Sequence, residues 1–220
     1  MAISKLNFNS LNVTPSASLA IGFDSGADNL ETGAGGGSMT FIKKLTASSS
    51  GTLSFVHGAS GVVLDGTYKE YVFIFNNIHP GTDDAHLTVG FRDGSTAYDA
   101  TKTTTAFRAF HFENDSNAGV GYQGNEDLAQ STNFQNLGQL QGNNNDASGA
   151  GYMHLFNPAS TTFVKHFISN YSHHYTNSAP GNINNYVAGY CNVTAAIDAV
   201  QFKMSSGNID AGTITLYGIA

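Results

Sequence analysis

Residues 70–77 read EYVFIFNN, and this stretch decides the fold class. Its aromatic residues stand at positions 71, 73 and 75, and Val72 and Ile74 stand between them. Because successive side chains of an extended chain point to opposite sides, both sides of this segment are apolar. The pattern predicts a central β-strand that is covered on both faces and forms the middle of the core.

Segments on either side repeat the period-two alternation, and no window longer than a turn or two favours an amphipathic helix. The loop between residues 40–46 and 52–57 has a length that suits a hairpin, and a Gly207-Asn208 corner suggests another between 198–205 and 213–219. Further strands are expected at 87–91, 110–112, 151–157, 162–170 and 185–193. About ten short strands predict an all-β protein, an antiparallel two-sheet β-sandwich of jelly-roll type. An immunoglobulin-like sandwich is the weaker alternative.

The chain divides by composition into residues 1–38 and residues 39–220. The first part ends in the glycine-rich run Gly33–Ser38, which reads as a hinge, so residues 1–38 are expected to be a tail or an arm that docks on a neighbouring subunit. Residues 39–220 are expected to form a single β-sandwich domain. Within it, the polar stretch 113–151 is expected to hold short strands near 120–122 and 134–140.

Charge and length argue against several classes of partner. The net charge is −7, and the 9 Lys and Arg residues form no cationic stripe, so nucleic acid is not an expected ligand. No apolar run approaches 18 residues, which argues against a membrane-spanning helix, and the first twenty residues do not resemble an export signal. The single cysteine, Cys191, is expected to be a buried residue of a strand.

The sequence contains no recognisable catalytic or cofactor-binding motif. His173 and His174 are adjacent, and on an extended segment they point to opposite faces, so they cannot chelate one metal ion together. We therefore expect no enzymatic activity, no metal and no cofactor. A polysaccharide-degrading enzyme remains an alternative, and it would need two carboxylates about 5–9 Å apart in a groove.

One segment combines aromatic rings with short polar side chains. Residues 170–177 and the following stretch to Tyr186 are expected to form a loop, and its candidate binding residues are Tyr171, His173, His174, Tyr175 and Tyr186. Such a mixture suits a subunit interface, where tyrosine is enriched, or a site for a sugar that stacks on rings. The interface is the favoured interpretation.

Two blocks of sequence resemble a known group of proteins. The C-terminal block runs from Ile197-Asp198-Ala199-Val200-Gln201-Phe202 through Ser205-Ser206-Gly207-Asn208-Ile209-Asp210-Ala211-Gly212 to Ile214-Thr215-Leu216-Tyr217-Gly218-Ile219. The upstream block includes Gly37-Ser38-Met39, residues 45–50 and 53–55, and residues 71–80. Together these segments cover about a fifth of the chain and resemble virion proteins of tailed bacteriophages, especially marine cyanophage-like ones.

This resemblance implies a structural protein of the virion, assembled in the host cytoplasm. A tail fibre or appendage subunit, or another particle-surface subunit, is expected; capsid decoration and a host-surface carbohydrate-binding module are the alternatives. The implied partners are other virion proteins and further copies of the chain, with a trimer favoured, and a host surface glycan. No catalytic residues accompany the resemblance.

Overall fold

The computed structural model describes residues 21–23, 30–32, 38–176 and 179–220, and the chain divides into two compact units. The first unit comprises residues 1–40 together with Ala220. Its described part contains β1 (Ile21–Phe23) and β2 (Leu30–Thr32), which pair in antiparallel fashion. The expected glycine hinge falls at 33–37, outside the described residues, as does most of the expected docking arm.

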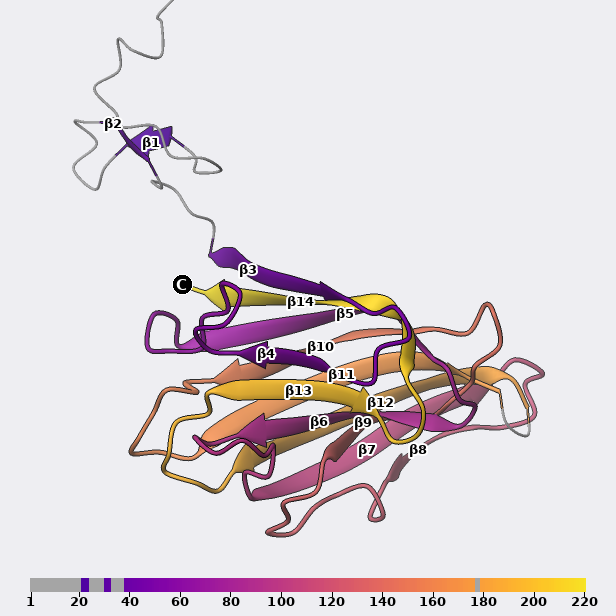
Figure 1. Cartoon of the computed structure of the whole chain (residues 1–220). Coiled ribbons are helices and arrows are strands. Elements are labelled where there is room, and N and C mark those ends of the chain that lie inside the picture. The colour runs from indigo at the N-terminus through magenta and orange to yellow at the C-terminus, as the bar shows by residue number, and fades with distance from the viewer. Residues whose placement is uncertain (1–20, 24–29, 33–37, 177–178) are drawn as a thin grey trace, which may run out of the picture. The chain divides into compact units, whose positions relative to one another are not determined.

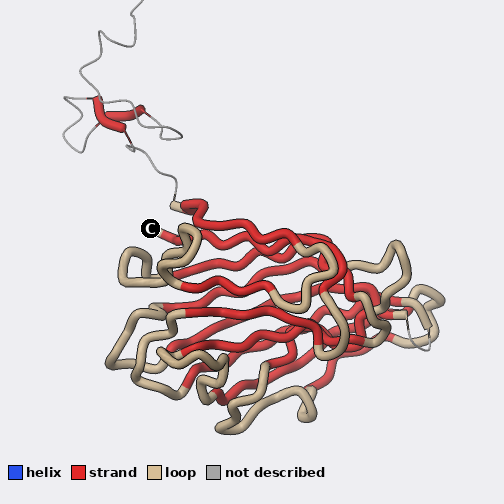
Figure 2. The backbone as a smooth tube through the Cα atoms, in the orientation of Figure 1, coloured by secondary structure: helices blue, strands red, loops and turns tan. Residues whose placement is uncertain are grey.

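The second unit, Phe41–Ile219, is built from strands and loops, and its described residues contain no helix (Figure 2). Its strands, with β3 beginning just before the unit, are β3 (Met39–Thr46), β4 (Leu53–Val56), β5 (Glu70–Pro80), β6 (Ala85–Arg92), β7 (Lys102–Phe112), β8 (Ala118–Tyr122), β9 (Gln135–Gln141), β10 (Gly149–Phe156), β11 (Lys165–Tyr175), β12 (Gly181–Cys191), β13 (Ala199–Met204) and β14 (Ile209–Ile219). β8 and β9 confirm the short strands predicted within residues 113–151.

These strands form two layers. One layer has the order β3-β14-β5-β10-β11-β12-β7-β8, and the other has the order β9-β6-β13-β4 (Figure 1). In the described residues a single backbone pair, Tyr175 with Gln141, links the layers by joining β11 to β9. The domain is therefore an all-β, nearly closed, barrel-like sandwich of antiparallel sheets. This confirms the predicted all-β class and the antiparallel two-sheet arrangement.

The core lies between the two layers and is rich in aromatic rings. β5 contributes Phe73 and Phe75 from the larger sheet, and both rings make edge contacts with Phe202 of β13 in the smaller sheet. The predicted central strand is confirmed, because β5 lies between β14 and β10. Its second face differs from the prediction: Val72 is buried by neighbours, but Ile74 is only half-buried.

The predicted hairpin between residues 40–46 and 52–57 is wrong. β3 pairs with β14 in the larger sheet, whereas β4 pairs with β13 in the smaller one. The connecting segment crosses from one sheet to the other, and its amides bond to β14: Ala47 N–H donates to the Gly212 carbonyl and Ser49 N–H to that of Asp210, each at 2.9 Å. A turn-like sequence therefore marks a crossover here.

The predicted C-terminal hairpin fails for the same reason, since β13 and β14 lie in different sheets. Two features of this region nevertheless agree with the sequence pattern. Gly207 has a positive φ of 68°, and an added Cβ there would overlap Thr82, so the corner requires glycine. The apolar residues that alternate along the two strands are buried, as the period-two pattern predicts: Phe202, Met204, Ile214 and Leu216.

Candidate functional site

The candidate binding segment is a pair of strands, so the expected loop is wrong. β11 and β12 pair in unbroken register from Lys165 with Cys191 to Tyr175 with Gly181. The burial of β11 alternates along most of its length, because every second residue faces the core. The tyrosines, histidines and asparagines that suggested a loop occupy both sides of this regular ladder.

Tyr171 and His173 point into the core and are not surface ligands. The Tyr171 hydroxyl donates a 2.8 Å hydrogen bond to Gln141 Oε1, and Gln141 Nε2 donates to the Ile78 carbonyl at 2.5 Å. His173 Nε2 lies 2.5 Å from the Gln139 carbonyl oxygen, so this nitrogen carries the hydrogen and donates it. Burial raises the pKa of Tyr171 and lowers the pKa of His173 to about 4. Both residues belong to a buried polar network between the layers.

The remaining three candidates lie in different surroundings. Tyr175 stacks on Phe112, with ring centroids 5.9 Å apart, and Tyr186 stacks on Phe107 at 4.7 Å. His174 points away from the core, as expected from its opposition to His173, and its Nε2 lies 3.5 Å from Glu113. The five predicted residues therefore do not converge on one site.

A polar hollow of about 510 Å³ contains His174. Polar side chains line it together with Phe112 and small residues, and the Ser172 hydroxyl donates a 2.7 Å hydrogen bond to Asn182 Oδ1 within it. The principal lining residues are His111, Glu113, Ser148, Ala150, Ser172, His174 and Asn182. With one carboxylate and several neutral hydrogen-bonding groups, the hollow suits a hydroxylated ligand.

A second polar hollow, of about 270 Å³, lies beside β7, β9 and the segment 123–126. Arg108 donates a 3.0 Å hydrogen bond to Gln139 Oε1 at its wall, and Glu126 lies 3.7 Å from His86. Burial by itself would raise the pKa of Glu126, but hydrogen bonds from His86 and Asn136 outweigh it and lower the pKa. These groups are tied to one another, so they fix the 123–126 segment against the sheet.

Two lysines buried beside Cys191 were not expected from the sequence. Lys165, Cys191 and Lys102 are neighbours in register on β11, β12 and β7. Each ammonium donates a 2.7 Å hydrogen bond to a carbonyl oxygen, Lys102 to Ala100 and Lys165 to Val193. Burial lowers the pKa of both lysines and raises the pKa of Cys191 to about 12. Cys191 is a buried thiol of low reactivity, as predicted.

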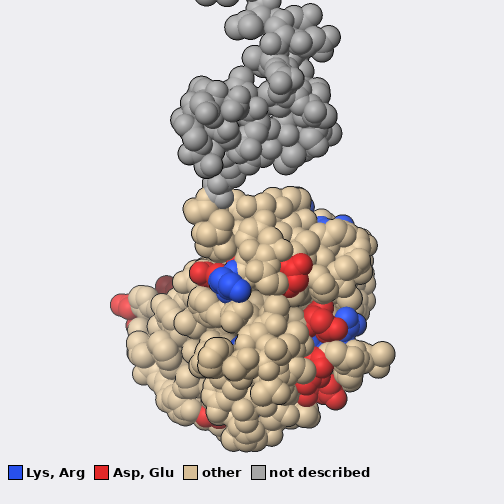
Figure 3. All heavy atoms as spheres, turned by 90° about the vertical axis from the view of Figure 1, so that its left-hand side faces the viewer, with Lys and Arg blue, Asp and Glu red and all other residues tan. Residues whose placement is uncertain are grey.

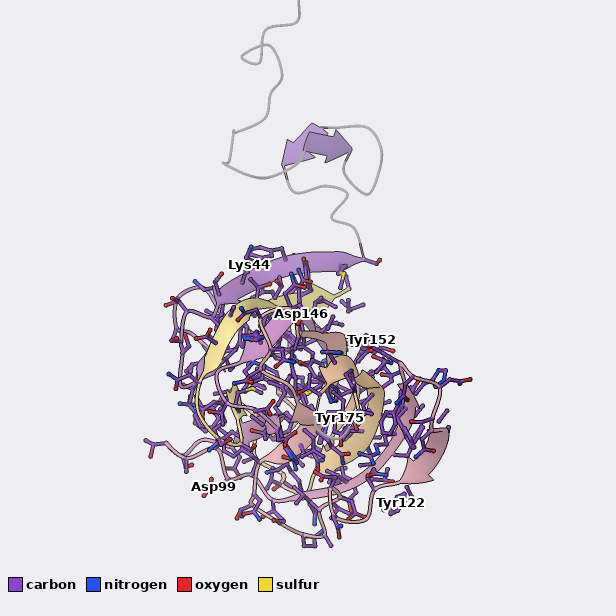
Figure 4. The ribbon with its side chains drawn as sticks, turned by 90° about the vertical axis from the view of Figure 1, so that its right-hand side faces the viewer. Lys44, Asp99, Tyr122, Asp146, Tyr152 and Tyr175 are labelled. Carbon is purple, nitrogen blue, oxygen red and sulfur yellow. The ribbon has the colours of Figure 1, made fainter. Side chains whose placement is uncertain are left out.

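The outer side of the larger sheet carries exposed rings, which we call the outer aromatic face. Its members are Phe107, Tyr122, Tyr152, Ile168 and Tyr186, with exposed fractions between 37% for Tyr186 and 61% for Tyr122. Viewed along the strands, Tyr152 and Tyr122 lie on the same side of the domain (Figure 4). The sequence contains one signal of this face, the apolar residues on the second side of β5. From the sequence alone, they predict the covered second face of a central strand.

Charged groups are sparse on the protein. At one end of the strands, Lys, Arg, Asp and Glu form isolated spots and small groups among uncharged atoms (Figure 3). Among the described residues, no three His, Cys, Asp or Glu side chains gather as a metal site would require. The described part of the chain contains no helix long and apolar enough to cross a membrane. No known protein family, curated protein or solved structure matches the chain.

Proposed function

We propose that the chain is a non-enzymatic structural subunit of a tailed-bacteriophage particle, in a tail fibre or appendage or at the particle surface. The proposal joins the resemblance of the two sequence blocks to a jelly-roll assignment of the fold. Jelly rolls recur in viral capsid and lectin domains. Because one fold can host many functions, the fold alone does not define the role, and the surfaces of the domain bear on it as well.

The observation that carries the proposal is the order of strand pairing. Eight strands pair in a nested order, in which the first pairs with the eighth, the second with the seventh, the third with the sixth and the fourth with the fifth. These pairs are β3 with β14, β4 with β13, β5 with β10, and β6 with β9. They form two four-stranded sheets, β3-β14-β5-β10 and β4-β13-β6-β9. This nested order matches the strand order of jelly rolls, and it supports that assignment over an immunoglobulin-like sandwich.

Two insertions enlarge one sheet of this eight-stranded core. β7 and β8 lie between the fourth and fifth core strands, and β11 and β12 lie between the sixth and seventh. β12 pairs with β7, and β11 pairs with β10, so the four extra strands widen one sheet to eight strands. Most of the outer aromatic face lies on these insertions, as expected if they adapt a common fold to assembly.

The surface hollows support a non-enzymatic role. Glu113 is the one carboxylate that lines the 510 Å³ hollow, and Glu126 is the one that lines the 270 Å³ hollow. Two further hollows on the outer side of the larger sheet have no carboxylate in their walls. Hydrolysis of a polysaccharide by the usual mechanism would need a pair of carboxylates in one such groove.

Purified particles test this function directly. Particles produced from the genome that encodes the chain are separated on a density gradient and analysed by quantitative mass spectrometry. We expect the chain to co-migrate with infectious particles in a fixed ratio to the major capsid protein, either as a tail component or as the alternative capsid decoration. Its presence in the infected-cell extract without enrichment in particles would contradict the proposal.

The 510 Å³ polar hollow favours a second function, binding of a host surface glycan. Glycan-array binding is measured for the wild-type chain, for Asn182→Ala and for Asn133→Ala, an exposed asparagine outside the hollow. We expect Asn182→Ala to weaken binding by about tenfold or more, as the loss of a buried hydrogen bond to a ligand does, and Asn133→Ala to leave it unchanged. Absence of binding by the wild-type chain to host polysaccharides would remove this function.

A further inference from the structure

A ridge of side chains crosses the outer side of the larger sheet. In register, Tyr152 on β10, Asn170 on β11, Tyr186 on β12, Phe107 on β7 and Tyr122 on β8 are neighbours. The rings of Phe107 and Tyr186 stack within 6° of parallel, so this part of the ridge is a stiff block. These rings remain 43% and 37% exposed, because nothing in the described part of the chain covers them.

A groove runs beside this ridge. Its floor is formed by Ala188 on β12 and Thr105 on β7, which are direct neighbours in register and stand two residues from Tyr186 and Phe107 on the same strands. Ile168 walls the groove from β11. Two adjoining hollows, of about 430 and 170 Å³, share these three residues. Ridge and groove are therefore parallel and about 7 Å apart along the strands.

This arrangement is complementary to itself. Consider a twofold axis that lies in the interface, runs parallel to the ridge and passes midway between ridge and groove. Rotation about this axis places the ridge of each copy over the groove of the other. The stacked rings Tyr186 and Phe107 of one copy then lie over Ala188 and Thr105 of the other. Face-to-face packing of sheets at about 10 Å interdigitates side chains in this manner. We propose that two copies of the chain pack through their outer aromatic faces about such an axis.

Charge distribution favours a second copy over other occupants. Each chain carries a net charge of −7, so copies repel one another unless they meet on an uncharged surface. Neither the ridge nor the groove contains Lys, Arg, Asp or Glu, and Glu70, two strands from β11, contacts His154. Among the described residues, the carboxylates beside this surface are already bonded, Glu70 to His154 and Asp127 to the Tyr122 hydroxyl. A cationic partner would have to displace these contacts, whereas an identical copy meets an uncharged ridge and groove without repulsion.

The available area also fits a stable pair. The five strands that carry the ridge, spaced about 4.8 Å apart and with side chains covering about 20 Å along them, present about 500 Å² to a partner. Two copies would therefore bury about 1,000 Å² in total, which is the area expected of the smaller specific protein interfaces. The second apolar side of β5, with its half-buried Ile74, lies in the same sheet and would gain the cover that its sequence predicts.

The test compares oligomeric states of the full chain. Sedimentation velocity over a range of concentrations is measured for the wild type, for Ile168→Glu and for Phe163→Glu, which adds the same charge at a 69% exposed ring outside the face. We expect a dimer that Phe163→Glu preserves and that Ile168→Glu weakens by about 30-fold or more, because a charge is desolvated in the interface. Circular dichroism checks that both variants fold.

Crosslinking tests the twofold geometry without a destabilising charge. Across the proposed axis Ile168 of one copy faces Asn170 of the other, and Cys191 is buried and does not compete. Sheets packed about 10 Å apart hold facing Cα atoms too far apart for a disulfide, so a short bismaleimide reagent is used as the crosslinker. When Ile168→Cys and Asn170→Cys chains are mixed in equal amounts and crosslinked, we expect mixed dimers to exceed either homodimer by clearly more than the twofold that random pairing gives. A monomer at all concentrations, a trimer, or a dimer insensitive to Ile168→Glu would overturn the proposal.

A monomer whose tyrosine fluorescence changes on addition of a host polysaccharide would assign the face to a glycan and likewise overturn it. The inference rests on the proposed role as an assembling subunit, but the two fail separately. Particle association tests the role, whereas the mass in solution and the crosslinks test the interface.

Discussion

At the scale of single residues, Tyr171 shows how small neighbours make room for a buried ring. A Cβ added at Gly149 on β10 would overlap the Tyr171 hydroxyl, and one added at Gly138 on β9 would overlap its ring. Both glycines therefore let the ring lie between the layers, where its hydroxyl reaches Gln141. The alternation of β11 predicts that Tyr171 faces the core. The space for its ring depends on Gly138 and Gly149, which stand on other strands and cannot be identified from the sequence around Tyr171.

Gly149→Ala should therefore destabilise the fold. We expect a loss of about 3 kcal/mol in the free energy of unfolding, because the new methyl group displaces Tyr171 and breaks its buried hydrogen bond. Urea unfolding followed by circular dichroism measures this loss. Gly66→Ala is the matched control, since a Cβ at Gly66 meets nothing within 4 Å. Equal stability of the two variants would contradict this account of Tyr171.

His173 gives the fold a dependence on pH. Its folded-state pKa of about 4 lies below the ordinary 6.5 because burial penalises the charged ring, so the unfolded chain binds a proton more readily between these values. The contribution of neutral His173 to the free energy of unfolding is complete above about pH 6.5. It falls by about 1.4 kcal/mol per pH unit as the pH drops toward 4.

Replacing His173 should flatten this dependence. Between pH 7 and pH 5 the wild type should lose about 2 kcal/mol more unfolding free energy than His173→Gln, which keeps a hydrogen-bond donor but does not titrate. Urea unfolding at intervals of half a pH unit measures both slopes. Parallel curves would show that His173 is hydrated or partnered in a way that the structure does not contain.

At the scale of elements, the sequence predicts strands well and their partners poorly. The alternation around β5, β10 and β14 is local, and it predicts these strands because each must bury one side. Pairing depends on residues far apart in the chain, since β3 pairs with β14 and β4 pairs with β13. A short polar segment such as residues 47–51 reads as a hairpin turn whether it reverses within one sheet or crosses to the other.

The same limit explains the site predictions. Polar residues inside β11 suggested a loop, because asparagine, serine and histidine are common in turns. Across the core, Gln141 and the Gln139 carbonyl on β9 bond to the Tyr171 hydroxyl and to His173 Nε2, and these contacts allow a strand instead. The outer aromatic face was not predicted, because an apolar side chain at an outer position looks the same in sequence as one in the core.

The four-ring cluster that joins the two sheets should dominate stability among the elements. Phe202 on β13 makes edge contacts with Phe55, Phe73 and Phe75 and is fully buried. Phe202→Ala should cost about 3–5 kcal/mol in unfolding free energy, because it removes a ring and leaves a cavity between the layers. Thermal and urea unfolding would reveal the loss; a cost near that of Phe163→Ala, an exposed ring, would contradict the assignment.

At the scale of the whole molecule, the β-sheet domain is a nearly closed sandwich whose larger sheet has one covered side and one exposed side. The net charge of −7, together with the uncharged ridge and groove, predicts how association between copies depends on salt concentration. If copies meet on this surface, rising salt screens their repulsion while the apolar contact persists.

Association should therefore tighten with salt. Between 50 and 500 mM NaCl we expect the dissociation constant of the pair to fall by a few-fold, to about a third or less, because the long-range repulsion is screened. Analytical ultracentrifugation at several salt concentrations gives this constant. A constant that rises with salt would indicate an interface held by ion pairs, which the outer aromatic face cannot supply.

The central claim is that the outer aromatic face is a contact between copies in an assembled particle. Electron cryomicroscopy of purified particles tests it most directly. We predict density for paired copies with Tyr186 of one chain in van der Waals contact with Ala188 of its neighbour. Particles in which this face is open to solvent, or is covered by a different protein, would contradict the claim.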